Sequence, residues 1–396
     1  MIPFRASSPP HLTTLVLLAA TSTMTLNLIV PSLTNIAVDL DADYAVISLA
    51  LGGYLATTAL VEFSVGPLSD RIGRRPVLLA ALSVFTVASL AGAVAQTAET
   101  FLAARMLQAG VISGYVLSLA IVRDTHDGAE VARLLGKIAM AMAIAPMLGP
   151  MVGSLLDATL GWRAIFLLYG AIGAALLCLV WVDLGETLLA REDPSERKRQ
   201  GPGALLRQPL FWCYAACTTF STGAFYIFLA GAPPIAAQVF DVPTAGLGVF
   251  VGSITAGFMT GSFLGGRLSR RWSTATVMLV GRIVACAGLL TGMAVLASGI
   301  VVPLLYFGST IFVGIGNGLT MPNSNAGAMS VLPRLAGSAA GFTGGMTLAT
   351  GAVLTTATGA LIAQRPVPIL LLALMLAASF AGLLSAVAAI RLERWR

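Results

Sequence analysis

Residues 66–75 read Gly-Pro-Leu-Ser-Asp-Arg-Ile-Gly-Arg-Arg, and residues 266–271 read Gly-Arg-Leu-Ser-Arg-Arg. Four residues of the first stretch recur in the second at an offset of 200 positions, close to half of the 396-residue chain. Both stretches are basic, and each follows a long apolar run. Recurrence of a short loop at this spacing is typical of proteins built from two copies of one helical unit, so the sequence predicts a duplicated fold.

The composition places this chain in a membrane. Apolar residues make up 57% of it and charged residues 10%, whereas soluble globular proteins carry about 25% charged residues. So few charges cannot cover the surface of a soluble body of this length, which excludes disordered, fibrous and ordinary cytosolic proteins. We therefore expect a polytopic membrane protein with lipid as its outer solvent. The two histidines and four cysteines have no metal-ligand or redox spacing, so we expect no metal and no cofactor.

Twelve apolar runs are long enough to cross a bilayer, which takes about 20 residues. They cover 12–35, 45–66, 75–96, 100–122, 134–157, 163–182, 209–231, 243–266, 274–298, 300–322, 335–361 and 367–390. The first run resembles a signal peptide because Arg5 precedes it, but it is too long and lacks a clear cleavage site. The expected fold class is an all-α membrane protein with twelve transmembrane helices in two pseudo-symmetric six-helix bundles.

The distribution of Lys and Arg predicts the orientation of these helices. With the N-terminus inside, the basic loops are cytoplasmic, and only Arg163 and Arg365 fall outside. Both termini are then cytoplasmic. The longest polar stretch, 184–208, separates an N-terminal bundle (1–183) from a C-terminal bundle (209–396). We interpret this stretch as a solvated linker; the alternative is that its basic run binds anionic lipid headgroups.

Further motifs accompany the paired loops. They are Arg105, Gln108, Gly110 and Gly114 in the fourth span, Val122-Arg123-Asp124 at its end, and Ala145-Pro146-Met147-Leu148-Gly149-Pro150-Met151-Val152-Gly153 in the fifth. In this order and on these spans, the chain resembles the major facilitator superfamily over nearly its whole length, and within it the Bcr/CflA-type drug:proton antiporters. The resemblance implies the major facilitator fold and a secondary active exporter that works by alternating access, as a monomer in the bacterial inner membrane.

The resemblance also implies a set of gating residues. They are Gly66, Asp70, Arg71, Gly73, Arg74 and Arg75 in the loop after the second span, and Pro146, Gly149, Pro150 and Gly153 in the fifth span. Asp70 is suited to meet the positive N-terminus of a neighbouring helix or a nearby arginine. In the fifth span, prolines bend the helix and glycines let a neighbour approach closely. The alternatives are a solvated turn that only sets topology and a kinked packing helix.

Three ionisable side chains lie at membrane depth, where a charge is costly and by default functional: Glu62, Arg105 and Arg282. Arg105 matches an arginine that the family connects with proton transfer. The alternative is a fixed cation bonded to backbone carbonyls. Arg282 matches no family motif, and we interpret it as a side chain that reaches to the inner surface.

The first span departs from the family pattern. In that span the Bcr/CflA type carries a motif similar to Asp-x-Tyr-Leu-Pro-x-x-Pro, whereas this chain has Asn27-Leu28-Ile29-Val30-Pro31-Ser32-Leu33-Thr34. Asn27 can hydrogen-bond a ligand but cannot take up a proton. Glu62 lies one turn before Gly66, and a carboxyl group in a partly dry site favours its protonated form. We therefore hypothesise that protonation moved to Glu62; the alternative is that Glu62 pairs with Arg71 or Arg123.

In the family, the substrate cavity is bordered by spans one, four, seven and ten. The residues that these spans offer here are Asn27, Tyr115, Phe220, Phe225, Tyr226, Phe228, Asn317 and Asn323. Aromatic rings with scattered amides suit a moderately lipophilic, neutral or weakly polar compound. In span ten, Gly and Pro over 314–323 predict backbone that unwinds or bends.

The predicted function is export of small lipophilic compounds, including antibiotics, in exchange for protons. The alternative is an exporter or uncoupled facilitator of an endogenous metabolite, such as a sugar, an amino acid derivative or a siderophore precursor. The sequence shows no catalytic nucleophile, metal cluster or carboxylate pair, so an enzyme is not expected. The expected partners are the substrate, protons and membrane lipid, and no nucleic acid, because the basic residues belong to short membrane loops.

Overall fold

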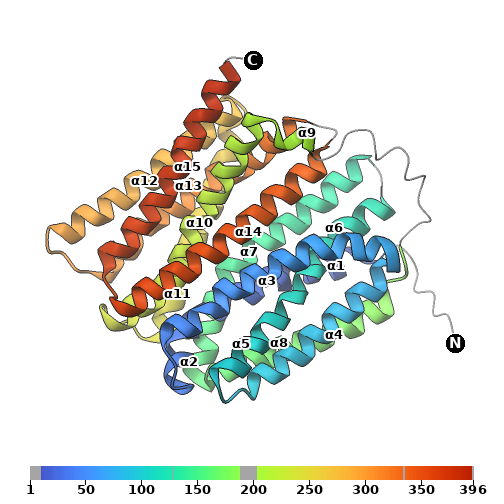
Figure 1. Cartoon of the computed structure of the whole chain (residues 1–396), viewed down its shortest axis with the longest axis horizontal. Coiled ribbons are helices and arrows are strands. Elements are labelled where there is room, and N and C mark those ends of the chain that lie inside the picture. The colour runs from blue at the N-terminus through green and yellow to red at the C-terminus, as the bar shows by residue number, and fades with distance from the viewer. Residues whose placement is uncertain (1–9, 127, 188–202, 333–334, 395–396) are drawn as a thin grey trace. The chain divides into compact units, whose positions relative to one another are not determined.

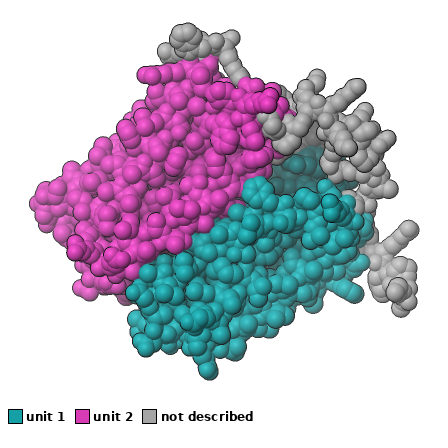
Figure 2. Space-filling model, in the orientation of Figure 1, with its two compact units in different colours: residues 1–192 teal, residues 193–396 magenta. Residues whose placement is uncertain are grey.

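The computed structural model describes residues 10–126, 128–187, 203–332 and 335–394 (Figure 1). In this part of the chain all regular secondary structure is helical. The chain divides into two compact units, Met1–Glu192 and Asp193–Arg396 (Figure 2). Most of the predicted linker over 184–208 lies outside the described residues.

The helices of the two units match the predicted spans. In the first unit they are α1 (Leu12–Asn27), η1 (Val30–Ser32), α2 (Leu33–Asp39), α3 (Tyr44–Ile72), α4 (Arg74–Ala93), α5 (Ala98–Gln108), η2 (Ala109–Val111), α6 (Ile112–Thr125), α7 (Gly128–Leu160) and α8 (Arg163–Asp183). In the second they are α9 (Gly203–Leu206), α10 (Pro209–Gln238), α11 (Thr244–Leu268), α12 (Thr274–Ala297), α13 (Pro303–Ser330), α14 (Ala336–Gln364) and α15 (Pro368–Arg394). Among the described residues, 11 helical segments are long and apolar enough to cross a membrane, and α7 adds the shorter apolar stretch Leu148–Leu160.

The duplication predicted from the paired loops is confirmed by the backbone. Helix α3 begins at Tyr44 and α11 at Thr244, and both are preceded by an aspartate in the left-handed region, Asp41 with φ 46° and Asp241 with φ 49°. This conformation is uncommon for a residue other than glycine. Its recurrence at the same offset shows that the two units reverse the chain in the same way after their first span.

Spans one and four are each interrupted by a 3₁₀ turn. In span one, α1 ends at Asn27 and η1 carries Pro31, which has no backbone N–H to donate. In span four, η2 separates α5 from α6. The Ser22 hydroxyl of α1 donates to the Val111 carbonyl of η2 at 2.7 Å. Because lipid offers no water to such carbonyls, a neighbouring side chain must satisfy them.

Helix α13 is continuous through Pro322, so the prediction of unwound backbone over 314–323 is wrong, and the alternative, that this stretch bends, stays a prediction. Its glycines serve close packing instead. A Cβ at Gly314 would overlap the Ile254 carbonyl of α11, and one at Gly316 would overlap the Gly281 carbonyl of α12. Glycine at these positions lets α13 lie between two helices at backbone contact distance.

We expect Gly261→Ala in α11 to destabilise the second unit by about 1–3 kcal/mol, because its Cβ would overlap the Ile315 carbonyl of α13. Gly266→Ala is the matched control on the same helix, where a Cβ meets nothing within 4 Å. Thermal unfolding of the purified variants in detergent measures the difference. Equal melting temperatures for the two variants would contradict the packing role of these glycines.

Candidate functional site

Arg105 is the centre of a buried polar network in the first unit. Its side chain is 0% exposed. Its Nε donates to the Ala50 carbonyl at 3.2 Å and its Nη2 to the Thr25 carbonyl at 2.8 Å. The guanidinium also lies over the Tyr54 ring at 4.1 Å from the ring centre. One side chain on α5 therefore ties together α1 and α3.

Gln108 extends this network to a fourth helix. Arg105 Nη1 donates to Gln108 Oε1 at 2.9 Å, and Gln108 Nε2 donates to the Ser89 hydroxyl of α4 at 2.8 Å. The Tyr169 hydroxyl of α8 donates to the same Thr25 carbonyl at 3.0 Å. These contacts are those of a fixed cation bonded to neutral acceptors. Participation of Arg105 in proton transfer stays a prediction.

The second unit also buries an arginine. Arg282 on α12 is 0% exposed, so the interpretation that it reaches the inner surface is wrong. Its Nη2 donates to Asn317 Oδ1 at 2.7 Å and its Nε to the Thr320 hydroxyl at 3.0 Å, both on α13. Helix α12 packs against α13 and α15, and the Arg282 side chain is fully enclosed. Arg282 Nη1 has no hydrogen-bond partner among the described residues.

The fifth span packs against the break in the first. A Cβ at Gly149 would lie 3.1 Å from Asn27 Cβ, and one at Gly153 would overlap the Leu28 carbonyl. Pro150 is buried between them, and the side chain of Pro146 lies outside the described residues. Asn27 is 3% exposed, and its Nδ2 donates to the Thr23 carbonyl at 2.9 Å. Asn27 Oδ1 is a buried acceptor with no partner.

Glu62 lies half-buried on α3, close to Tyr115 of α6. Within the described residues it forms no ion pair, and Arg71 and Arg123 are exposed. The predicted alternative, a pair with one of these arginines, is therefore not observed. The structure thus places Glu62, predicted to bind a proton, close to Tyr115, predicted to line the substrate cavity.

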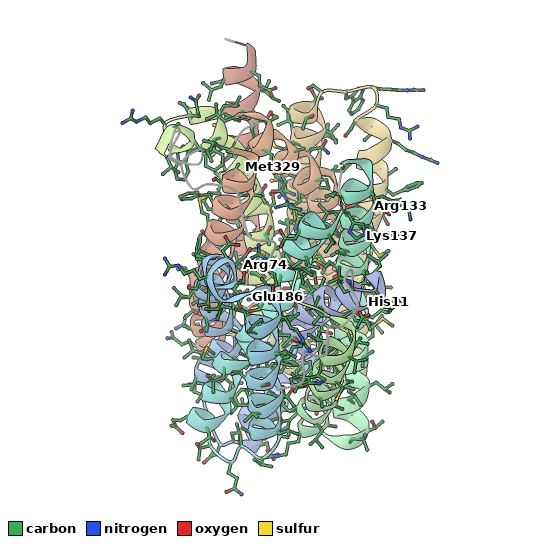
Figure 3. All side chains as sticks on the ribbon, turned by 90° about the vertical axis from the view of Figure 1, so that its right-hand side faces the viewer. His11, Arg74, Arg133, Lys137, Glu186 and Met329 are labelled. Atoms are coloured by element: carbon green, nitrogen blue, oxygen red, sulfur yellow. The ribbon has the colours of Figure 1, made fainter. Side chains whose placement is uncertain are left out.

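The loop after the second span is organised by Arg74 rather than by Asp70. Arg74 is 4% exposed and pairs with Asp70 at 2.8 Å and with Asp124 of α6 at 3.0 Å. The Glu186 carboxylate accepts from the backbone N–H of Arg74 at 2.9 Å (Figure 3). It thus occupies the positive N-terminus of α4, one of the two positions expected for Asp70. Asp70 itself takes the other expected position, beside an arginine.

The other loop residues set the turn. Gly73 has φ 103°, which disfavours any side chain, and a Cβ there would also overlap Glu186. Arg75 donates to the Trp181 carbonyl at 2.8 Å, whereas Arg71 and Gly66 make no such contact among the described residues. Sequence reasoning missed Glu186, which follows directly after the sixth span. Its only sequence signal was an acid just beyond a span end.

The remaining cavity candidates lie in the second unit and do not form one cluster. The Phe225 and Tyr226 rings contact each other, and Phe228 is fully buried against Phe307. Asn323 Oδ1 accepts from the Ser269 hydroxyl at 2.9 Å. Asn317 is engaged with Arg282.

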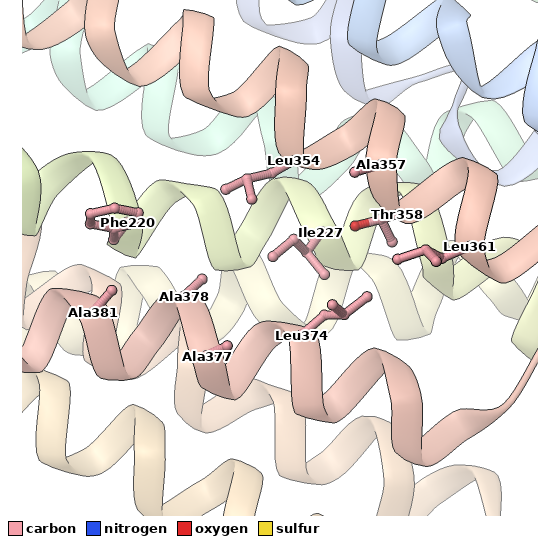
Figure 4. A pocket seen from close by; sticks show the side chains of 10 residues that line it. All are labelled: Phe220, Ile227, Leu354, Ala357, Thr358, Leu361, Leu374, Ala377, Ala378 and Ala381. Atoms are coloured by element: carbon pink, nitrogen blue, oxygen red, sulfur yellow. The ribbon is translucent and has the colours of Figure 1, made fainter.

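Phe220 lines an apolar groove of about 270 Å³ between α10, α14 and α15 (Figure 4). Its other walls come from residues such as Ile227, Leu354 and Leu374, with Thr358 as a polar side chain. A groove of this composition accepts apolar groups.

The family model described as Major Facilitator Superfamily matches residues 15–356. This chain belongs to that superfamily. It is therefore a multi-pass membrane transporter of a small-molecule substrate. Its fold is similar to that of a bacterial homologue of the human lysosomal transporter Spinster, with a TM-score of 0.77 and 16% sequence identity over 97% of this chain and 96% of that one.

The sequence relatives of this chain include proteins named for drug resistance. Multidrug resistance protein D of Escherichia coli is 28% identical over 84% of both chains. A chloramphenicol resistance protein of Pseudomonas aeruginosa is 32% identical over 59% of this chain and 56% of its own. The uncharacterized MFS-type transporter YdgK of Bacillus subtilis is 30% identical over 87% of both chains.

We expect Gln108→Leu to destabilise the first unit by about 1–3 kcal/mol, because it leaves a donor of the buried Arg105 unsatisfied. Gln108→Glu retains the acceptor for Arg105 and should cost less. Thermal unfolding in detergent compares the two variants. If Gln108→Leu melts like the unchanged protein, the network does not contribute to stability.

Proposed function

We propose that this transporter exports small lipophilic compounds, including antibiotics, in exchange for protons by alternating access. The drug-resistance names of its relatives support the substrate class. The apolar groove lined by Phe220 and Ile227 of α10 suits such compounds better than charged metabolites. We further propose that it acts as a monomer in the bacterial inner membrane with both termini in the cytoplasm.

Glu62 is the observation that carries proton coupling in this proposal. It is a half-buried carboxyl group within a membrane-spanning helix, and no described cation pairs with it. A carboxylate without a counter-charge at this depth gains from binding a proton. Tyr115, one of the proposed cavity residues, lies close to Glu62, so a ligand bound against Tyr115 would affect the proton held by Glu62.

A second candidate function is uncoupled transport. The specific observation in its favour is Asn27, which stands where the related antiporters carry an acid and which cannot titrate. In that case Asn27 Oδ1, a buried acceptor without a partner, would serve only in ligand binding.

We expect the purified protein in weakly buffered solution to release protons when lipophilic antibiotics and dyes, chloramphenicol among them, are added. Glu62→Gln should abolish the release, because an amide cannot hold the proton that the ligand displaces. The measurement is the pH change on ligand addition, beside ligand binding by calorimetry.

Glu130→Gln is the control, because Glu130 is an exposed carboxyl group near the start of helix α7. Ligand binding without proton release in the unchanged protein would favour uncoupled transport. Proton release that persists in Glu62→Gln would exclude Glu62 as the carrier.

We also propose that Arg74, together with its partners Asp70 and Asp124, governs the conformational cycle. Arg74→Ala removes the partner shared by Asp70 and Asp124 and should abolish transport, whereas Arg71→Ala should not, because the Arg71 side chain is exposed. Dye transport by reconstituted vesicles measures the effect, with binding as the test of folding. Equal loss in both variants would mean that the loop acts only through its total positive charge.

A further inference from the structure

Asp157 is a buried carboxyl group that the proposed cycle does not yet use. It lies on α7 and is 8% exposed. Asn35 Nδ2 of α2 donates to its Oδ2 at 2.8 Å. Ser32 of η1 is the other side chain that interacts with the carboxyl group. Both partners belong to the segment that follows the break in the first span.

The position of Asp157 continues the line of contact between spans five and one. Gly149 faces Asn27 and Gly153 faces Leu28, and Asp157 follows four residues later on the same face of α7. The glycines bring the two backbones together, and Asp157 then holds the segment beyond the break. Sequence reasoning missed it because Asn35 lies 122 residues away in the chain.

No charged side chain among the described residues forms an ion pair with Asp157. The charged or titratable side chains on the helices packed against α7 are His11 before α1, Tyr115, Arg123 and Asp124 on α6, Arg163, Tyr169, Cys178 and Asp183 on α8, and Asp39 at the end of α2. Helix α7 itself adds Glu130, Arg133 and Lys137 in its first turns. Among the described residues, none of them forms an ion pair with Asp157, whose side-chain partners are Ser32 and Asn35. Arg163 is paired with Asp39, and Asp183 with His11.

The two neutral partners suit both protonation states of the carboxyl group. An ionised carboxylate accepts the Asn35 hydrogen bond at full strength. A protonated carboxyl group gains an O–H donor, and the oxygen of the adjacent Ser32 hydroxyl can accept it, because a hydroxyl group both donates and accepts hydrogen bonds. The same segment ends at Asp39, which pairs with Arg163, and both charged side chains are partly exposed; exposed charges belong to a surface that meets water rather than lipid.

We infer that Asp157 is a second proton-binding residue, which takes a proton from the outer side and thereby controls how firmly the segment 28–39 is held against α7. The proton comes from water, forms the O–H bond of the carboxylic acid and later returns to water, with no other bond made or broken. Asp157 is a positioning residue, since it acts through the first span. The inference rests on the proposed proton antiport and adds a site to it.

The test compares hydrogen exchange of residues 28–39 in Asp157→Asn and the unchanged protein, without substrate and at the same pH, so that intrinsic exchange rates cancel. Asparagine mimics the neutral acid. The ratio of exchange rates should therefore be several-fold at neutral pH and fall to one at a pH acidic enough to protonate Asp157. Glu130→Gln should give a ratio of one throughout.

Two outcomes overturn the inference. A raised ratio that does not change with pH means that Asp157 is only structural, and a ratio of one at every pH means that it does not hold the segment. If Asp157→Asn fails to fold, Asn35→Ala removes the donor and keeps the acid, and the same pH-dependent ratio is expected. Because no substrate is present, a negative result leaves drug-induced proton release intact, and failure of the proposed function appears in that separate measurement.

Discussion

Each six-helix unit of this transporter is built around one fully buried arginine that no carboxylate neutralises among the described residues. A guanidinium in such a place needs an acceptor for its donors, because the surrounding lipid and apolar side chains provide none. Arg105 finds backbone carbonyls on α1 and α3 and the amide of Gln108. Arg282 finds Asn317 and a threonine hydroxyl on α13. In the first unit these bonds link α5 to α1 and α3 and, through Gln108, to α4; in the second they link α12 to α13.

Two groups of carboxylates in the first unit differ in whether a partner holds their negative charge. At the helix ends of the first unit, Asp70 and Asp124 pair with Arg74, while Asp183 and Glu186 accept from residues at the N-termini of α1 and α4. These acids have a cation or a helix N-terminus to hold their negative charge. Among the described residues Glu62 and Asp157 have neither, and they lie within the long helices α3 and α7. We therefore propose that acids of the second kind are the ones on which a proton gradient acts.

Much of the fold follows from local sequence, because a span is one apolar run and the paired loops repeat within a few residues. The contents of the bundles are less predictable. Arg282 has the buried apolar Leu82 at the equivalent place of the first unit, so the duplication gave no warning of a buried charge. The breaks in spans one and four, and the role of the α13 glycines in packing, depend on which helix lies alongside.

The candidate site was predictable where a motif names its residues and not where distant segments meet. Arg105, Glu62 and the Arg74 loop are recognisable from spacing and depth. Phe228 and Asn317 carried the same residue-type signal as a cavity lining, yet one is packed in the core and the other binds Arg282. Asp157 had no signal, because its importance comes only from the segment beyond the break in span one.

The central claim is that a proton gradient drives export. Its most direct test is dye movement in vesicles that contain the purified protein and carry an imposed pH difference with no membrane potential. Our account predicts that the dye becomes concentrated on one side while the pH difference lasts, and that a protonophore abolishes the concentration difference. If the dye only equilibrates, at the same rate with and without the pH difference, the protein is an uncoupled facilitator and the claim is wrong.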